Sequence, residues 1–442
     1  MASLEVQPLA KSFQTFFMGA AGSGPSDSYW LALLGGSAIE YGEAVTVDSS
    51  DNIIVAGEVR SDGAGVQDCL LAKYNTDGTL LWDKTLGESD VDKFLGVVTD
   101  SSDNVYASGL TGSQGVAFYD MLTTKYNSSG VIQWQRILGQ TYYDTGDSIT
   151  VDSSGNVYVG GRIRDSSQID HLGFYKYNNS GSLQFQTAID WSNAKQSHGR
   201  GIAIDSSGDI IICGNQAPSA NTTPAFALIK YNSSGALQYN KIFGSGGGGS
   251  SYFSGISLDS SDNIYLSGYQ NNVAVITKLN SSLVTQWSRT LTDGVGSNYF
   301  GVVVDGSGNT YACGVFQTTA VVAKYNSSGV LQWQNKLTAG TDQCAFTKIT
   351  INSSGTPIVT GYLDGDGAGG YDMVLLKLPP NGSGHGTYGS MVYASSSFTD
   401  AAYTLPTIAD RGTTTGSPSG TAATSTLISA DAVLSSEFFA IE

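Results

Sequence analysis

Residues 47–57 read Val-Asp-Ser-Ser-Asp-Asn-Ile-Ile-Val-Ala-Gly, and altered forms of this stretch recur six more times along the chain. Successive copies lie 46 to 54 residues apart. A regular period of this length indicates a propeller or another repeat array. The turn residue of each copy falls at Asp48, Asp100, Asp152, Asp205, Asp259, Asp305 and Asn352.

One repeat contains four short β-prone runs, which we name strands a to d. In the second repeat they are residues 96–100, 104–109, 121–126 and 131–138. Asp, Ser, Asn and Gly fill the links between a and b and between c and d, as tight hairpin turns require. Four antiparallel strands in about 50 residues are typical of a propeller blade.

The fourth strand shows how the ring closes. Its aromatic residue appears six times after a complete a-b-c unit and a seventh time ahead of the first unit, as Trp30. Blade 7 therefore takes strands a to c from residues 346–378 and strand d from the N-terminal side, which leaves no open sheet edge. The six that follow a unit are Trp82, Trp134, Phe185, Tyr239, Trp287 and Trp333. The sequence predicts an all-β, seven-bladed propeller over residues 29–380, with an N-terminal arm (1–28) and an irregular C-terminal extension (381–442).

These repeats resemble a known family. Asp-Ser-Ser-Gly-Asn-Val-Tyr-Val-Gly-Gly at 152–161, Lys-Tyr-Asn-Ser-Ser-Gly at 125–130, 230–235 and 324–329, and the Gln-Trp-Gln of strand d are similar to SBBP-type β-propeller repeats. The resemblance covers about residues 29–378 and implies the seven-bladed fold. Such repeats occur in secreted, surface and viral proteins. Blades 5 and 6 depart from the pattern, because their b–c links are short and lack the usual Asp.

Composition excludes several classes of partner. The net charge is −17, and 13% of residues are charged, against about a quarter in typical proteins. The chain therefore lacks the attraction for phosphate that drives nucleic-acid binding. No apolar run reaches the roughly 18 residues of a membrane helix, so we expect no membrane insertion. We interpret the four cysteines, Cys69, Cys213, Cys313 and Cys344, as small core residues, and the N-terminal residues as a poor signal peptide.

The sequence shows no catalytic constellation. His171, His198 and His385 lie in different loops, and no nucleophile elbow or phosphate loop stands in a fitting context. Asp364, Asp366 and Asp372 form an acidic cluster that we interpret first as solvated turn carboxylates, then as a calcium site, and last as a catalytic pair. We therefore expect a protein that is not an enzyme and has no required cofactor.

One lysine recurs in every strand c: Lys73, Lys125, Lys176, Lys230, Lys278, Lys324 and Lys377. A functional ring of seven ammonium groups is one interpretation. The preferred one is structural, because strand c runs toward the end of the blade that carries the a–b turn. There the ammonium can meet a turn carboxylate or backbone carbonyls.

The d–a and b–c links vary in length, share one face, and mix aromatic and arginine side chains with Gly, Ser and Asn. Such a mixture is typical of binding surfaces on a rigid scaffold. The alternative is that some aromatics, Phe253 and Phe300 above all, only plug the tops of the blades. The predicted ligand-binding residues are Tyr142, Tyr143, Arg162, Trp191, Tyr252, Phe253, Tyr299 and Phe300.

The C-terminal extension is rich in Ser, Thr, Gly and Ala, and in texture the chain is similar to tail and capsid-appendage proteins of bacterial viruses, especially marine ones. We therefore expect a non-enzymatic virion structural or host-attachment protein, with other virion proteins, itself or a host glycan as partners. The alternatives are a secreted or cell-surface carbohydrate-binding propeller and a polysaccharide-cleaving enzyme. The apolar groups of the extension should be buried against another subunit, or else against the propeller itself: Met391, Tyr393, Phe438, Phe439 and Ile441.

Overall fold

The computed structural model describes residues 12–17 and 29–406 with short gaps, followed by four three-residue strands. The gaps are 36–37, 61–65, 114–117, 140–141, 165–167, 191–196, 217–223, 244–249, 341–342, 365–369 and 389–390. Every regular element in these ranges is a β-strand, and they hold no helix that could cross a membrane.

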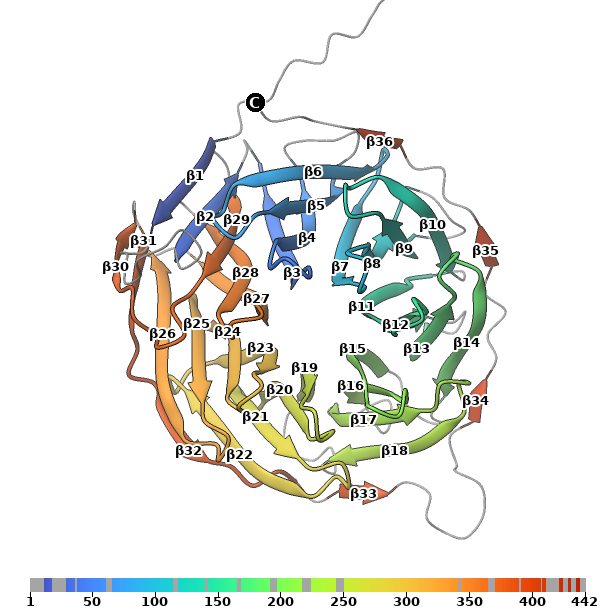
Figure 1. Cartoon of the computed structure of the whole chain (residues 1–442). Coiled ribbons are helices and arrows are strands. Elements are labelled where there is room, and N and C mark those ends of the chain that lie inside the picture. Colours follow the sequence, from blue (N-terminus) through green and yellow to red (C-terminus); the bar gives the residue numbers. More distant parts are fainter. Residues whose placement is uncertain are drawn as a thin grey trace, which may run out of the picture.

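The strands form seven sheets around a central axis (Figure 1), which confirms the seven-bladed propeller. Strands a to d of blades 1 to 3 are β3 (Glu40–Val47), β4 (Ile53–Val59), β5 (Asp68–Tyr74) and β6 (Leu80–Gly87); β7 (Asp92–Thr99), β8 (Val105–Thr111), β9 (Asp120–Tyr126) and β10 (Ile132–Gly139); and β11 (Thr145–Val151), β12 (Val157–Arg164), β13 (Asp170–Tyr177) and β14 (Leu183–Asp190). Those of blades 4 to 6 are β15 (Ser197–Ile204), β16 (Ile210–Gln216), β17 (Ala225–Tyr231) and β18 (Leu237–Phe243); β19 (Ser251–Leu258), β20 (Ile264–Gln270), β21 (Val273–Leu279) and β22 (Thr285–Thr292); and β23 (Ser297–Val304), β24 (Thr310–Phe316), β25 (Thr319–Tyr325) and β26 (Leu331–Ala339).

Blade 7 closes the ring with strands from both sides of the sequence. Its strands a to c are β27 (Cys344–Ile351), β28 (Pro357–Asp364) and β29 (Tyr371–Lys377), and strand d is β2 (Trp30–Gly35). The pairing is antiparallel, with Trp30 opposite Lys377 and Leu34 opposite Met373. The predicted closure by the N-terminal strand is confirmed.

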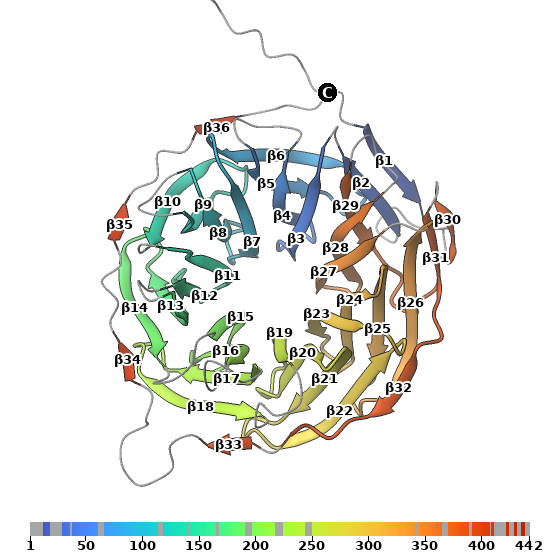
Figure 2. The same cartoon turned by 180° about the vertical axis from the view of Figure 1, so that it is seen from behind.

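Each blade also carries a fifth strand outside strand d, which the sequence did not predict. β1 (Ser12–Phe17) adds to blade 7, and six strands of the C-terminal extension add to blades 6, 5, 4, 3, 2 and 1 in that order. Figures 1 and 2 show this circumferential belt at the rim of the ring. The belt strands are β31 (Met391–Ser395), β32 (Thr399–Ala402), β33 (Ile408–Asp410), β34 (Thr421–Ala423), β35 (Ile428–Ala430) and β36 (Ser435–Glu437), with β30 (Gly386–Tyr388) outside β31.

The belt covers apolar groups that we had expected to lie against another subunit. Met391 and Tyr393 are 1% and 0% exposed, and they pack into the core of blade 6 in their own chain. Their burial therefore needs no partner, and the alternative of folding back on the propeller is correct for this pair. Phe438, Phe439 and Ile441 lie outside the described residues.

The aromatic residue of strand d packs between two blades. Trp134 is 9% exposed and lies in one cluster with Tyr106 of its own blade and Tyr177 of blade 3. Gly181, in the c–d turn of blade 3, has a φ of 77° and lies so close to the indole that an added Cβ would be 2.7 Å from the ring. Only glycine meets both conditions without strain.

The lysine of strand c has the structural role that we preferred. Lys73 Nζ lies 2.7 Å from Asp48 Oδ2 in the a–b turn, and it donates to Ser128 O of the next blade at 3.3 Å. Lys230 pairs with Asp205 at 2.7 Å, and Lys377 donates to Thr76 O of blade 1 at 3.0 Å. Lys73 and Lys377 therefore join neighbouring blades, and Lys230 holds the a–b turn of its own blade. The four cysteines are free and buried, in agreement with the core interpretation.

Candidate functional site

One equivalent position of the seven repeats places its side chain at the centre of the propeller. The residue five positions before the turn residue lies where strands a and b lose register, so it is a β-bulge residue. Bulges re-aim side chains and occur often beside functional sites. The seven residues are Glu43, Leu95, Asp147, Arg200, Ser254, Phe300 and Thr347.

All seven bulge residues line one depression of about 1030 Å³, which we call the axial pocket. It opens on the loop face, the side formed by the d–a and b–c links, because Gln67, Val91, Tyr119 and Tyr143 of those links also line it. Its volume is at the upper end of the range for small-molecule sites.

The next residue of each strand a forms a second ring deeper in the channel. Six of these residues are small, and the seventh is Lys348 of blade 7. Space explains the small residues: a Cβ added to Gly255 would lie 2.7 Å from Ser267 Oγ and 3.1 Å from Phe300 O. Lys348 lines both the deeper cavity and the axial pocket. The small members are Ala44, Gly96, Ser148, Gly201, Gly255 and Gly301.

Lys348 and Glu43 are half-buried in the central channel. Burial lowers the pKa of the Lys348 ammonium, and the charges of Glu43 and Asp147 oppose that shift. Burial likewise raises the pKa of the Glu43 carboxyl, which Lys93 and Lys348 partly offset. Shifted ionisable groups gathered in a cleft are typical of functional sites.

Two further carboxylates organise the cations of the pocket wall. Glu58, 3% exposed in its side chain, lies 3.5 Å from Arg60 and 3.7 Å from Lys93. Burial raises the pKa of Glu58 even though these two cations lower it.

Asp170 is also 3% exposed in its side chain, and it holds a cationic part of the wall. It contacts Arg164 at 2.5 Å, His198 at 3.1 Å and Arg162 at 3.9 Å. Burial acts to raise the pKa of Asp170, but the hydrogen bonds from His198 and Arg164 outweigh it and leave the pKa below its usual range.

Tyrosines form another part of the wall. Tyr41 and Tyr362 line the pocket with ring centroids 4.8 Å apart, and Tyr371 packs against both, at 5.3 and 5.2 Å. Burial, with the nearby Tyr371 and Tyr362, raises the pKa of Tyr41 to about 12, so its hydroxyl stays a hydrogen-bond donor at neutral pH. Rigid aromatic rings beside polar groups suit the apolar faces and hydroxyls of a sugar ring.

The structure brings some of the predicted residues together and separates others. Tyr143, Arg162 and Phe300 line the axial pocket. Tyr252 lies beside it, with the Arg200 guanidinium 4.7 Å from its ring.

The remaining predicted residues lie elsewhere. Phe253 and Tyr299 are 0% exposed and belong to the cores between blades, which corrects their assignment as ligand contacts. Their side chains point to the sheet face that packs, as alternation along strand a dictates. Tyr142 is half-buried outside the pocket lining, and Trp191 lies outside the described residues.

The acidic cluster is only partly described. Asp372 is fully buried, Asp364 is partly exposed, and Asp366 lies outside the described residues. In the described part of the chain, no three His, Cys, Asp or Glu side chains are arranged to hold a metal ion.

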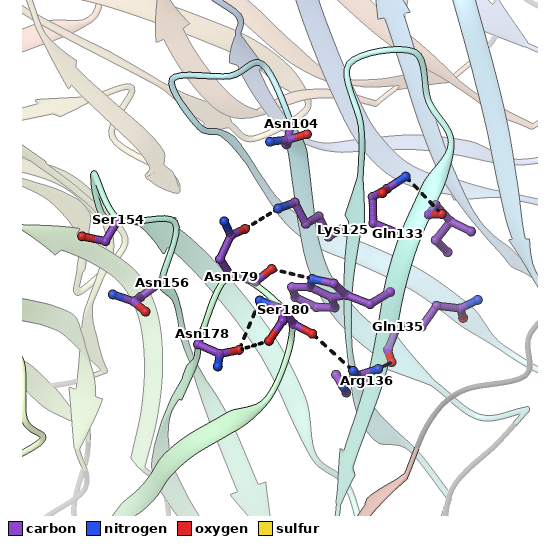
Figure 3. Close-up of a pocket in the computed structure, with 12 residues that line it drawn as sticks. Asn104, Lys125, Gln133, Gln135, Arg136, Ser154, Asn156, Asn178, Asn179 and Ser180 are labelled. Carbon is purple, nitrogen blue, oxygen red and sulfur yellow. Dashed lines mark hydrogen bonds between the residues drawn. The ribbon is translucent and has the colours of Figure 1, made fainter.

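A second hollow lies between blades 2 and 3, on the side of the short turns (Figure 3). Its polar groups already hold the two blades together: Trp134 Nε1 donates to Asn179 O at 3.0 Å, Arg136 Nε donates to Gly181 O at 2.7 Å, and Lys125 contacts the Asn179 side chain. Lys73 and Trp82 repeat this arrangement on Ser128 O one blade earlier. The hollow is therefore a seam of the repeat, and the axial pocket is the stronger candidate.

Comparison with known proteins agrees with this fold. The SBBP β-propeller repeat matches residues 133–163, and a β-propeller domain of unknown function, DUF5122, matches residues 49–80. An uncharacterized WD repeat-containing protein of Acanthamoeba polyphaga mimivirus is 24% identical over a 181-residue match that covers 30% of this chain and 13% of that protein. The chain thus spans about an eighth of that relative.

Several solved structures are similar at low identity. An α-L-arabinofuranosidase from Fusarium graminearum is 8% identical, with a TM-score of 0.43 over 64% of this chain and 92% of that one. An ulvan lyase of a polysaccharide lyase family is 11% identical, with a TM-score of 0.40 over 71% of this chain and 87% of that one. These likenesses assign no activity. The chain is a seven-bladed β-propeller protein that carries an SBBP-type repeat.

Proposed function

We propose that the chain is a non-enzymatic virion structural or host-attachment protein of a bacterial virus, and that its axial pocket binds a saccharide on the target surface. The observation that carries the binding role is the convergence of seven dissimilar bulge residues on one pocket, while the turn residue, the strand c lysine and the strand d aromatic recur with little change. A uniform scaffold with a variable centre is the arrangement expected of a recognition surface.

The contents of the pocket favour a polar, ring-shaped ligand. Tyr41, Tyr362 and Phe300 offer aromatic surface, and arginine, lysine and carboxylate side chains surround them. Concave sites with a few oriented polar groups are typical of small-ligand binding. A saccharide fits because it presents apolar ring faces and a rim of hydroxyls.

The viral setting is supported by the texture of the sequence and by the partial likeness to a mimivirus protein. The belt also supports a particle surface, because it covers strand edges that would otherwise template aggregation. A secreted or cell-surface carbohydrate-binding propeller of a bacterium is the alternative with the same pocket. Mass spectrometry of purified virus particles separates the two: finding the chain among particle proteins supports the proposal, and its absence there favours the alternative.

A glycan array tests the binding role. We expect wild-type protein to retain a subset of glycans, and Phe300→Ala to lose them with an unchanged melting temperature. Leu81→Ala, at an exposed apolar residue of the outer strand β6 that is not among the pocket-lining residues, is the control and should bind as wild type. Retention of no glycan, or equal loss in both variants, would refute a saccharide site in the axial pocket.

Polysaccharide cleavage is the second candidate, because burial raises the pKa of both Glu43 and Glu58 and a protonated carboxyl is what a general acid requires. Release of new reducing ends from bound polysaccharide, lost in Glu58→Gln, would favour the enzyme over the non-enzymatic proposal.

A further inference from the structure

The charge of the axial pocket is opposite to that of the chain. The whole sequence has 38 Asp and Glu against 21 Lys and Arg. The pocket lining has five cations, Arg60, Lys93, Arg162, Arg200 and Lys348, against three carboxylates. An anionic protein that gathers positive charge in one concave site focuses its field there and attracts anions to it.

Lys348 is the least expected member of this group. In the other six blades the residue at the equivalent position is small, because the strands approach the axis closely there. The single long cation at this position lines both the narrow ring and the pocket above it. Packing does not demand it, because Ser148 occupies the equivalent position of blade 3 within the same ring.

The cations differ in how far they are already neutralised. Arg60 and Lys93 share one carboxylate, Glu58. Neither Arg200 nor Lys348 has a carboxylate within ion-pair distance among the described residues: Arg200 Nε donates to the Asn215 amide oxygen at 3.2 Å instead. The buried Arg162 Nε has no hydrogen-bond partner in the described part of the chain, although the other end of its guanidinium lies 3.9 Å from Asp170.

Two carboxylates of the pocket lining oppose the positive charge of Lys348. Glu43 and Asp147 line the same pocket and are close enough to Lys348 to favour its charged form. Burial raises the pKa of the Glu43 carboxyl, which disfavours its charged form. Five cations line the pocket against three carboxylates, and Asp170 behind the wall pairs with Arg162, so an excess of one positive charge is left for a ligand to neutralise.

We infer that the saccharide of the proposed function is anionic: the axial pocket takes a sugar whose carboxylate or sulfate ester reaches Lys348 and Arg200 at the pocket floor. Charge-assisted hydrogen bonds to oxyanions are about twice as strong as neutral ones, and the arginine fork suits carboxylate and sulfate geometry. The tyrosines at the wall then contact the sugar ring. This inference rests on saccharide binding and adds the class of the sugar.

Three tetrasaccharide probes of matched length test the class by isothermal titration calorimetry: oligogalacturonate for carboxylate, a carrageenan oligomer for sulfate ester, and maltotetraose as the neutral sugar. We expect at least one anionic probe to bind ten-fold or more tightly than maltotetraose. Its affinity should weaken between about 50 and 500 mM salt, because added ions screen the attraction. The better of the two anionic arms identifies the oxyanion.

Two variants test whether the preference for an anionic sugar depends on Lys348 and Arg200. Lys348→Ser installs the residue of blade 3, so it should fold, and Arg200→Gln keeps the bond to Asn215. Each should lower the affinity for the anionic probe about ten-fold or more and leave maltotetraose unaffected. Lys336→Ser, on the outer strand β26 and not among the pocket-lining residues, is the matched control and should bind as wild type.

The possible outcomes distinguish a failure of the anionic class from a failure of saccharide binding itself. Equal or tighter binding of the neutral probe overturns the anionic class and leaves the saccharide site standing. Binding of none of the three overturns both. An anionic preference that survives Lys348→Ser and Arg200→Gln together overturns the assignment to the pocket floor.

Discussion

Trp134 of blade 2 donates a hydrogen bond from its indole Nε1 to the backbone carbonyl of Asn179, 3.0 Å away in the c–d turn of blade 3. The same bond joins Trp30 to Thr76 at 3.1 Å, between blades 7 and 1. The aromatic residue of strand d is therefore both a core side chain and a fastener between neighbouring blades.

Two substitutions of Trp134 should measure the packing and the hydrogen bond separately. Trp134→Ala removes the buried ring and should lower the free energy of unfolding by about 3–5 kcal/mol. Trp134→Phe keeps most of the packing and loses the hydrogen bond, at about 1 kcal/mol. Blade 3 already uses Phe185 at this position, so the Phe variant should fold. Denaturant titration measures both, and equal losses would contradict the division.

The turn aspartates should make stability depend on acid. Burial would raise the pKa of Asp152, but hydrogen bonds from Asn156, Tyr158 and Ser154 outweigh it and hold the pKa below its usual value. Stability from such a group is present above the unfolded pKa of about 3.9 and is lost as the pH falls through the lower folded pKa. Asp152→Asn should therefore be less stable than wild type at pH 7, and the gap should narrow below about pH 4.

Blade 7 provides the natural precedent for that variant. Asn352 stands at the equivalent position and accepts from the backbone nitrogens of Ser354 and Thr356 at 3.1 and 2.8 Å. The fold should therefore survive the change. Urea unfolding at several pH values measures the gap, and a gap that stays constant from pH 7 to pH 3 would exclude the aspartate as its source.

The affinity of the axial pocket for an anionic sugar should rise in mild acid. Burial raises the pKa of Glu58 above 4.5, so this carboxyl takes up a proton as the pH falls from neutrality toward that value. Protonation frees the charge of Arg60 and Lys93 for the ligand. Glu58→Gln imitates the protonated form and should bind tightly at pH 7 with little dependence on pH. Calorimetry with the charged and neutral probes tests this, and a neutral sugar showing the same trend would contradict it.

Truncations should distinguish the closing strand from the outer strands. Deleting residues 1–28 removes β1 and keeps β2, so the ring should stay folded. Deleting residues 1–36 removes β2, opens blade 7 and should cause aggregation, because an unpaired edge templates association. Size-exclusion chromatography compares the two, and a monomeric 1–36 deletion would refute closure by β2.

The C-terminal belt should also separate into two parts. Ending the chain at residue 406 keeps β31 and β32, whereas ending it at 380 uncovers the core of blade 6, where Met391 and Tyr393 are buried. We expect the longer variant to melt close to wild type and the shorter one several degrees lower. Calorimetry measures the difference, and equal melting temperatures would show that β31 adds no stability.

The sequence predicts the ring well, because each blade repeats the same turn residues, lysine and aromatic. The axial pocket is less evident from the sequence, although one position of the repeat marks it. The position five residues before the turn holds Glu43, Asp147, Arg200 and Phe300 among other types, whereas the turn residue itself hardly varies. Variation at this position of the repeat marks the bulge, but only the register of strands a and b shows that the bulge faces the axis. Phe253 and Tyr299 were misassigned because one position along a strand separates core from pocket.

The belt could not be predicted for a different reason. β33 to β36 have three residues each, which is too short for alternation between buried and exposed positions to appear. They pair through backbone groups of strand d, as β36 does with β6, and backbone pairing leaves little trace in side-chain sequence. Met391 and Tyr393 were expected to be buried against another subunit, or else against the propeller itself, and the second alternative is correct.

Closure by β2 has a consequence for synthesis on the ribosome. Trp30 is made early, and its partner Lys377 emerges about 350 residues later. At about 5–20 residues per second, β2 waits roughly 20 to 70 seconds with its blade unmade. Of the two strands that pair with β2 in the described part of the chain, β1 is the one close to it in sequence, with partners running from Ser12–Gly35 to Phe17–Trp30. Hairpins form in about 1–10 microseconds. During synthesis β1 can therefore pair with β2 and cover one of its edges until β29 is made. In the finished ring β1 keeps this pairing as the outermost strand of blade 7.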